Sequence, residues 1–152
     1  VTKLAANGQS LIASTYWGGT ESDTATGVDA DSLGNIYVSG YTLSTNIPVM
    51  HALQPNAPSV LGDDGFVFKM PPDASELTWS TYLGGASSEN TNGVTTGLPI
   101  RIAVNSQFQP FVFGFTNSAN FPLVNAHSVV GSAFLCKFAA DGQSLDFSTM
   151  VH

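Results

Sequence analysis

The sequence LTWSTYLGG at residues 77–85 decides the architecture, because related sequences occur twice more in the chain. Residues 11–19 read LIASTYWGG, and residues 145–151 read LDFSTMV. The shared serines, Ser14, Ser80 and Ser148, are 66 and 68 residues apart. A short apolar segment with one lysine precedes each copy at the same two intervals. Similarity that returns at a nearly fixed period indicates a repeat protein, in which each repeat is one structural unit.

The repeats contain short apolar segments without helical periodicity. These segments are rich in β-branched and aromatic residues and are bounded by Gly, Asn, Asp and Pro, which is typical of β-strands. The sequence therefore predicts an all-β protein. Ten strands are predicted, at residues 1–4, 11–17, 27–31, 36–41, 66–70, 77–83, 100–105, 111–116, 134–138 and 145–151.

The last eight predicted strands form two sets of four. Residues 27–42 align with 101–116 at an offset of 74, and the later strands of the two sets align at an offset of 68. The difference comes from a longer loop at residues 86–99. Four short strands joined by tight turns are the unit of a β-propeller blade. We expect a half-blade at 1–19 with the third and fourth strands, antiparallel blades at 20–85 and 86–152, and a larger propeller around them.

Several motifs of the chain, in this order, resemble the SBBP, or seven-bladed β-propeller, repeat of bacterial surface and secreted proteins. They are DSLGNIYVSGYT at 31–42, NIP at 46–48, FVFK at 66–69 and WSTYLGG at 79–85. The second repeat departs from the pattern at 105–110, NSQFQP, which lacks the acid and both turn residues. The resemblance implies a propeller fold. It implies no catalytic residues, because the family is defined by its repeat.

Composition excludes several classes of partner. The net charge is −7, and only four Lys and Arg residues are spread along the chain. Nucleic acids and anionic membranes require clustered cations, so we expect neither as a partner. No apolar run reaches the length of a membrane span. The low charge and the many Ser, Thr and Asn residues favour a secreted or cell-surface location. Cys136 alternates with Phe134 and Phe138, which favours a buried apolar side chain over a reactive thiol.

Asp29, Asp31 and Asn35 form a sparse calcium-loop pattern, because alternating oxygen ligands can converge on the ion. The full EF-hand spacing is missing. The alternative interpretation is a turn in which Asp31 caps the backbone and Gly34 adopts a positive φ. We favour the turn, keep calcium as a hypothesis and expect no other cofactor.

Acidic residues in predicted loops offer a second hypothesis. Asp63 and Asp64 are adjacent, and a carboxylate pair at a suitable separation can hydrolyse glycosidic bonds. The simpler interpretation is a turn that leads into the next strand. The other acids assigned to loops are Glu21, Asp23, Asp73 and Glu76.

The loops 43–65 and 117–132 are the best candidates for a binding rim. We assign Tyr41, His51, Asp63, Asp64 and His127 as candidate ligand-binding residues. Aromatic side chains such as Tyr41 can stack on sugars when exposed, although strand aromatics more often pack between blades. The two histidines lack any metal-binding spacing. The repeated lysines, Lys3, Lys69 and Lys137, favour a structural role.

These features predict a non-catalytic binding or scaffold module outside the cytoplasm, with a glycan or surface protein as possible ligand. A polysaccharide-acting hydrolase with rim carboxylates and a purely structural spacer are the alternatives. The half-blade lacks its first two strands, which should precede Val1. We therefore expect the chain to pack against the remaining blades of its propeller or against another chain.

Overall fold

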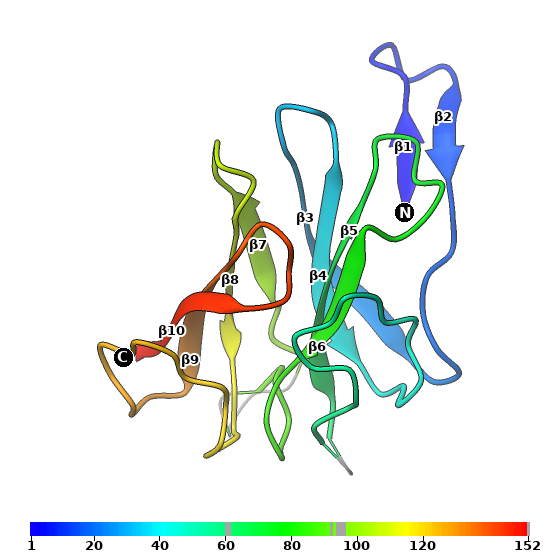
Figure 1. The fold of residues 1–152 in the computed structure, drawn as a ribbon. Coiled ribbons are helices and arrows are strands. Elements are labelled where there is room, and N and C mark those ends of the chain that lie inside the picture. The colour runs from blue at the N-terminus through cyan, green and yellow to red at the C-terminus, as the bar shows by residue number, and fades with distance from the viewer. Residues whose placement is uncertain (60–61, 92, 94–96, 152) are drawn as a thin grey trace.

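The computed structural model describes residues 1–59, 62–91, 93 and 97–151 (Figure 1). All regular secondary structure in this part of the chain is β, as predicted, and a helix that could span a membrane is absent from it. Parts of the predicted loops 43–65 and 86–99, and residue 152, lie outside the described residues. The strands are β1 (Thr2–Leu4), β2 (Leu11–Ser14), β3 (Asp23–Ala30), β4 (Ile36–Thr42), β5 (Asp64–Met70), β6 (Trp79–Leu83), β7 (Arg101–Val104), β8 (Pro110–Phe115), β9 (Ala133–Phe138) and β10 (Leu145–Val151).

The strands form three antiparallel sheets. We call β1–β2 the half-blade, β3–β4–β5–β6 blade 1 and β7–β8–β9–β10 blade 2. Within each sheet consecutive strands are neighbours, which is the meander of a propeller blade. Figure 1 shows the two blades side by side, with β3 next to β7, and the half-blade on the opposite side of blade 1. The prediction of four-stranded antiparallel blades is confirmed.

Blades 1 and 2 pack face to face through an apolar core. Strand alternation places one set of side chains from each blade in this interface. Each fully buried large side chain there stabilises the fold by about 1.5–3 kcal/mol. The buried residues are Tyr37, Val67, Trp79 and Leu83 from blade 1, Ile100 just before β7, and Val112, Phe121, Phe134, Cys136, Phe138, Leu145 and Met150 from blade 2 and its loops. Burial also raises the pKa of the Cys136 thiol to about 12, which suits the predicted apolar role.

The half-blade packs on the other face of blade 1. The Trp17 ring lies 4.6 Å from the Phe66 ring and 4.5 Å from the Phe68 ring. Val1 and Ala13 pack against the same cluster. Phe66 and Phe68 face the half-blade while Val67 faces blade 2, because successive side chains of a strand point to opposite faces.

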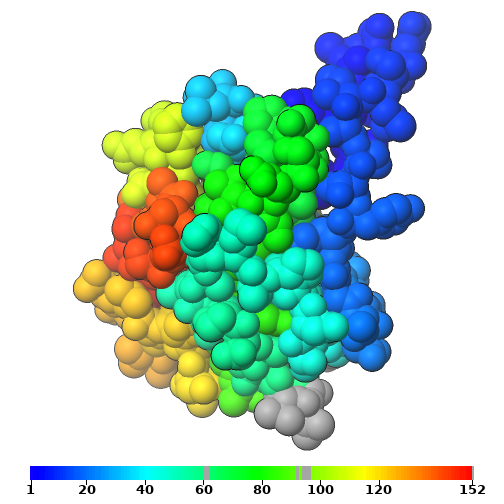
Figure 2. All heavy atoms as spheres, turned by 45° about the vertical axis from the view of Figure 1, so that its right-hand side comes forward, coloured from blue at the N-terminus to red at the C-terminus, as the bar shows by residue number. Residues whose placement is uncertain are grey.

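The loop between the second and third strands covers the outer edge of each blade. In blade 1, Met50 pairs with Ser80 of β6, and in blade 2, Val124 pairs with Ser148 of β10. The Ser80 hydroxyl also donates to the Pro48 carbonyl oxygen at 2.8 Å. An uncovered edge strand would offer free backbone groups to another sheet, so these loops protect the blade edges. Figure 2 shows the β4–β5 loop, in turquoise, spread over the surface of blade 1.

Candidate functional site

The chain enters blade 1 through a Gly-Gly pair followed by an acid. Gly19 donates its N–H to Asp23 Oδ2 at 2.8 Å, and the Thr42 hydroxyl donates to the other Asp23 oxygen. Ser44 donates its N–H to Thr42 Oγ1 at 2.8 Å. Asn46 Oδ1 accepts a hydrogen bond from the backbone N–H that follows Gly19, at 3.0 Å. This network, which we call the first junction, ties the start of β3 to the end of β4.

The same network recurs where the chain enters blade 2. Gly85 donates its N–H to Glu89 Oε1 at 3.0 Å, and the hydroxyls of Thr116 and Ser118 donate to the same oxygen. Asn120 Oδ1 accepts from the backbone N–H that follows Gly85, at 2.8 Å. In this second junction Glu89 takes the place of Asp23. The two junctions therefore repeat as hydrogen-bond networks, and not only as sequence.

The glycines are required because the acid lies against them. A Cβ atom on Gly18 would lie 2.3 Å from Asp23 Oδ2, and one on Gly84 would lie 2.5 Å from Glu89 Oε2. The second glycine of each pair is equally crowded. A Cβ on Gly19 would meet Ser44 at 2.4 Å, and one on Gly85 would meet Ser118 at 2.5 Å. Any larger residue would displace the junction.

The junction role of Asp23 was not predicted, and Glu89 was not among the candidate residues. The prediction that Asp23 lies in a loop is wrong, because Asp23 is the first residue of β3. The available signal was the spacing, since each acid follows the second glycine by four residues. The change from Asp to Glu and the different length of the following segment concealed that match.

Glu89 also forms part of a buried carboxyl pair with Asp64. Glu89 is fully buried and Asp64 is 2% exposed. Asp64 accepts a hydrogen bond from the Ser59 N–H at 3.0 Å, whereas Glu89 Oε2 has no hydrogen-bond partner in the described structure. Burial and the neighbouring Glu89 carboxylate raise the pKa of Asp64 to about 8, and burial raises the pKa of Glu89 to about 7. This pair can hold a proton near neutral pH.

The prediction that Asp64 lies in a loop is wrong. It is the first residue of β5, pairs with Thr42 of β4 and faces the second junction. Asp63 is half-buried, and its carbonyl oxygen accepts a hydrogen bond from the Glu89 N–H at 3.0 Å. The two adjacent acids thus lie in different surroundings, because successive residues entering a strand point to opposite sides.

The calcium candidates are occupied by protein hydrogen bonds. Asp31 accepts from the N–H groups of Leu33 and Asn35, the Asn35 amide and the Tyr37 hydroxyl. Burial raises the pKa of Asp31, but these hydrogen bonds outweigh burial and hold that pKa below its usual value. Asp29 instead accepts from the Val104 N–H of blade 2 at 2.7 Å. No group of three potential metal-ligating side chains converges among the described residues.

The remaining candidates do not converge on one site. Tyr41 is half-buried and packs against the core between the blades. His51 lies in the β4–β5 loop and His127 in the β8–β9 loop, and both are exposed. His51 has a φ of 48°. The two histidines therefore occupy corresponding loops of different blades.

The repeated lysines serve the packing. Lys69 Nζ lies 5.0 Å from the centre of the Tyr37 ring and 3.9 Å from Asp31 Oδ2. Lys137 Nζ lies 5.8 Å from the centre of the Phe111 ring and 3.0 Å from Asp146 Oδ2. A cation over an aromatic face is attracted by the ring electrons. Each lysine thus joins the third strand of its blade to the second strand.

A hollow in the described structure lies beside the half-blade. It has a volume of about 580 Å³ and is bounded by β1, β3, β4 and β7. Its lining includes Val1, Thr2, Thr26, Val28 and Ile102. The lining is mainly apolar, so the hollow suits burial of a protein segment better than binding of a charged ligand.

Meander blades, face-to-face packing and repeated junctions together define a protein built from β-propeller repeats. The model of the SBBP family, described as a beta-propeller repeat, matches residues 14–48. This segment of the chain therefore carries an SBBP repeat. The match runs from the end of β2 to the β4–β5 loop and contains the whole first junction. No curated protein matches the chain.

Proposed function

We propose that this chain is a non-catalytic part of a β-propeller that acts outside the cytoplasm as a binding or scaffold module. One observation carries the proposal: the charged side chains that could take part in chemistry are used in contacts that hold each blade together. Asp31, Lys69 and Lys137 form interstrand contacts, and Glu89 accepts hydrogen bonds within a junction. The SBBP resemblance and the low charge support the location.

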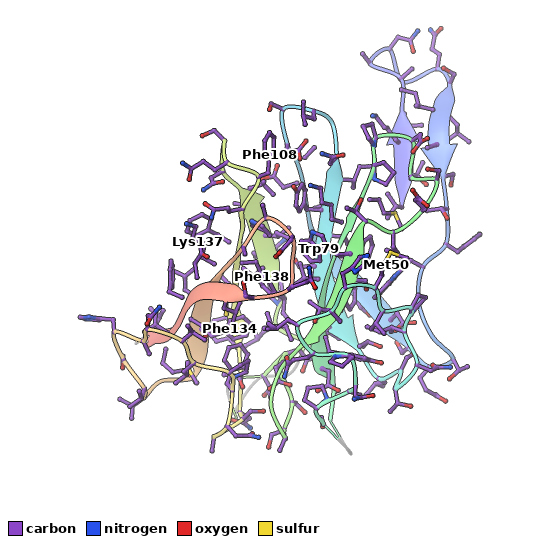
Figure 3. The ribbon with its side chains drawn as sticks, viewed as in Figure 1. Met50, Trp79, Phe108, Phe134, Lys137 and Phe138 are labelled. Carbon is purple, nitrogen blue, oxygen red and sulfur yellow. The ribbon has the colours of Figure 1, made fainter. Side chains whose placement is uncertain are left out.

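The surface left for a ligand is the pair of loops along the blade edges. Their exposed groups are apolar, histidine and amide side chains, which suit contact with a protein or glycan surface. The exposed residues in the β4–β5 and β8–β9 loops include Leu43, Val49, Met50, His51, Val124, Asn125, His127, Val129 and Val130. Figure 3 shows Met50 on the loop that crosses blade 1.

The position of Asp64 argues against the rival hydrolase. Retaining and inverting glycosidases both need two carboxyl groups that reach the substrate. Asp64 is buried beside Glu89, and its neighbour Asp63 is only half-buried, so the pair does not face a common surface. A polysaccharide on the rim would not meet both groups.

The experiment combines a glycan and protein binding screen with assays for glycan hydrolysis. We expect saturable binding without turnover, and weaker binding after His51→Ala and His127→Ala. The exposed turn residue Leu33 lies outside both loops, so Leu33→Ala is the matched control. Hydrolysis that disappears in Asp63→Asn and Asp64→Asn would overturn the proposal in favour of the enzyme. If no glycan or protein binds, the binding function is wrong and the structural spacer is the remaining hypothesis.

A further inference from the structure

The second junction leaves one carboxylate oxygen unused, whereas the first junction uses both. Asp23 Oδ2 accepts from the Gly19 N–H, and Asp23 Oδ1 accepts from the Thr42 hydroxyl. In the second junction Glu89 Oε1 alone accepts the corresponding hydrogen bonds. Glu89 Oε2 is buried and has no hydrogen-bond partner among the described residues. A buried carboxylate oxygen without a partner is costly, so this oxygen indicates a ligand.

A second buried carboxyl group lies against this oxygen. Asp64 is 2% exposed, and its carboxyl group is within hydrogen-bonding reach of the Glu89 carboxyl group. The donors that contact the pair are neutral, namely backbone N–H groups and the hydroxyls of Thr116 and Ser118. Burial raises the pKa of both groups, and the nearby Asp63 carboxylate raises it further. The surroundings therefore concentrate negative charge that they do not neutralise.

The basic side chains of the protein are engaged away from this pair. The chain has only four Lys and Arg residues, and all four belong to the described part. Lys3 donates to the Pro72 carbonyl oxygen, Arg101 donates to the Thr26 carbonyl oxygen, Lys69 pairs with Asp31, and Lys137 pairs with Asp146. Two buried carboxylates need a cation or a proton to offset their charge.

The chemistry of the pair suits calcium. Its charged ligands are oxygens, which Ca²⁺ prefers, and Ca²⁺ also accepts backbone and amide carbonyl oxygens, so two carboxylates can supply all of the charge. Mg²⁺ usually keeps several of its water molecules, which a buried site disfavours. Zn²⁺ prefers nitrogen and sulfur ligands, but Cys136 lies in the core and His51 and His127 are exposed on loops. A monovalent cation would leave one negative charge buried.

We propose that Asp64 and Glu89 bind a calcium ion that joins the start of β5 to the second junction. Glu89 Oε2 and the Asp64 carboxylate hold the ion, while Glu89 Oε1 keeps the hydrogen bonds of the junction. This site is distinct from the calcium position expected at Asp29, Asp31 and Asn35. The inference goes beyond the proposed binding or scaffold function, because it requires no ligand on the loops.

A calcium titration of the chelator-treated protein at pH 8 tests the site, by calorimetry and by thermal unfolding. We expect one ion to bind per chain and the melting temperature to rise until the site is saturated. Magnesium should bind about tenfold more weakly or less. If calcium neither binds nor raises the melting temperature, the proposal is wrong and a proton alone neutralises the pair.

Two substitutions taken from the repeat itself locate the ion. Glu89→Asp copies the acid of the first junction, and Asp64→Ser copies Ser132, the counterpart of Asp64 at the 68-residue offset. Each should weaken calcium binding by about tenfold or more while the far-ultraviolet circular dichroism stays that of the parent. Asp73→Asn, which changes an exposed acid in another turn, is the control and should bind calcium like the parent. Parent-like calcium affinity in both site variants would overturn the proposal.

Discussion

The Trp79 ring of blade 1 stacks on the Phe138 ring of blade 2, with ring centroids 6.0 Å apart and an angle of 18° between the planes (Figure 3). Both residues are buried. They come from the fourth strand of one blade and the third strand of the next, so this contact joins consecutive repeats. The counterpart of Trp79 in blade 2 is Phe147, which is half-exposed because no described blade follows.

Replacement of Trp79 by alanine should destabilise the protein by about 3–5 kcal/mol, because it leaves a large cavity between the blades. Phe147→Ala is the matched control and should cost much less, since Phe147 faces solvent on one side. Urea unfolding of both variants measures the difference. Similar losses for the two substitutions would contradict the assigned interface.

Gly142→Ala should destabilise the fold more than Gly8→Ala. The two glycines occupy corresponding turns, AADGQSL at 139–145 and AANGQSL at 5–11, and have φ angles of 73° and 69°. A left-handed backbone costs any other residue about 1–2 kcal/mol in either turn. Only Gly142 has a neighbour, because its Cβ would lie 2.3 Å from the Trp79 ring, whereas the Cβ at Gly8 meets nothing within 4 Å. The crowding adds about 1–3 kcal/mol.

Thermal unfolding of the two glycine variants gives the comparison. A larger loss for Gly8→Ala than for Gly142→Ala would show that backbone strain, and not the contact with Trp79, controls these turns.

The free energy of unfolding should fall as pH rises from about 4 to 8. Asp64 and Glu89 both have a raised pKa in the folded protein, so the folded state binds more protons than the unfolded state in this interval. Their stabilising effect is complete below the ordinary carboxyl pKa and is lost as pH passes about 7 to 8. Glu89→Gln should reduce the fall by about 3 kcal/mol.

Asp73→Asn provides the control for this pH dependence. Hydrogen bonds from Ser75 lower the pKa of Asp73, so its contribution is lost only as pH decreases. The change in the free energy of unfolding between pH 5 and pH 9 is measured by denaturation. This change should be smaller than in the parent for Glu89→Gln and equal to the parent for Asp73→Asn. If the free energy of unfolding of Glu89→Gln changes between pH 5 and pH 9 as much as that of the parent, Glu89 is not the source of the pH dependence.

The outer face of blade 2 should promote association. The corresponding face of blade 1 is covered by blade 2. On blade 2 this face carries Phe111, Phe113, Phe115, Leu135 and Phe147, and Phe113 is 37% exposed. An open apolar sheet face is prone to association. Phe113→Lys should lower the apparent mass measured by light scattering, whereas Leu33→Lys, in an exposed turn, should not. Equal masses for parent and Phe113→Lys would contradict this role.

Much of the fold could be predicted because the relevant signals are local. Short segments rich in β-branched and aromatic residues, bounded by Gly, Asn, Asp and Pro, marked all ten strands. The repeat of Lys69 and Lys137 at the same strand position correctly indicated a packing role. The candidate rim residues were less predictable, since solvent exposure depends on which loops cover which edges.

The sequence by itself determined the strands, the repeat period and the order of the sheets, because each depends on residue patterns within one repeat. Only the tertiary structure revealed the buried pair of Asp64, the first residue of β5, and Glu89, in the segment between β6 and β7. It also decided that Gly142 lies against Trp79 while Gly8, in a nearly identical turn, has no neighbour. Such contacts depend on how one repeat packs against the next, and identical local sequences acquire different surroundings when only one of them is covered.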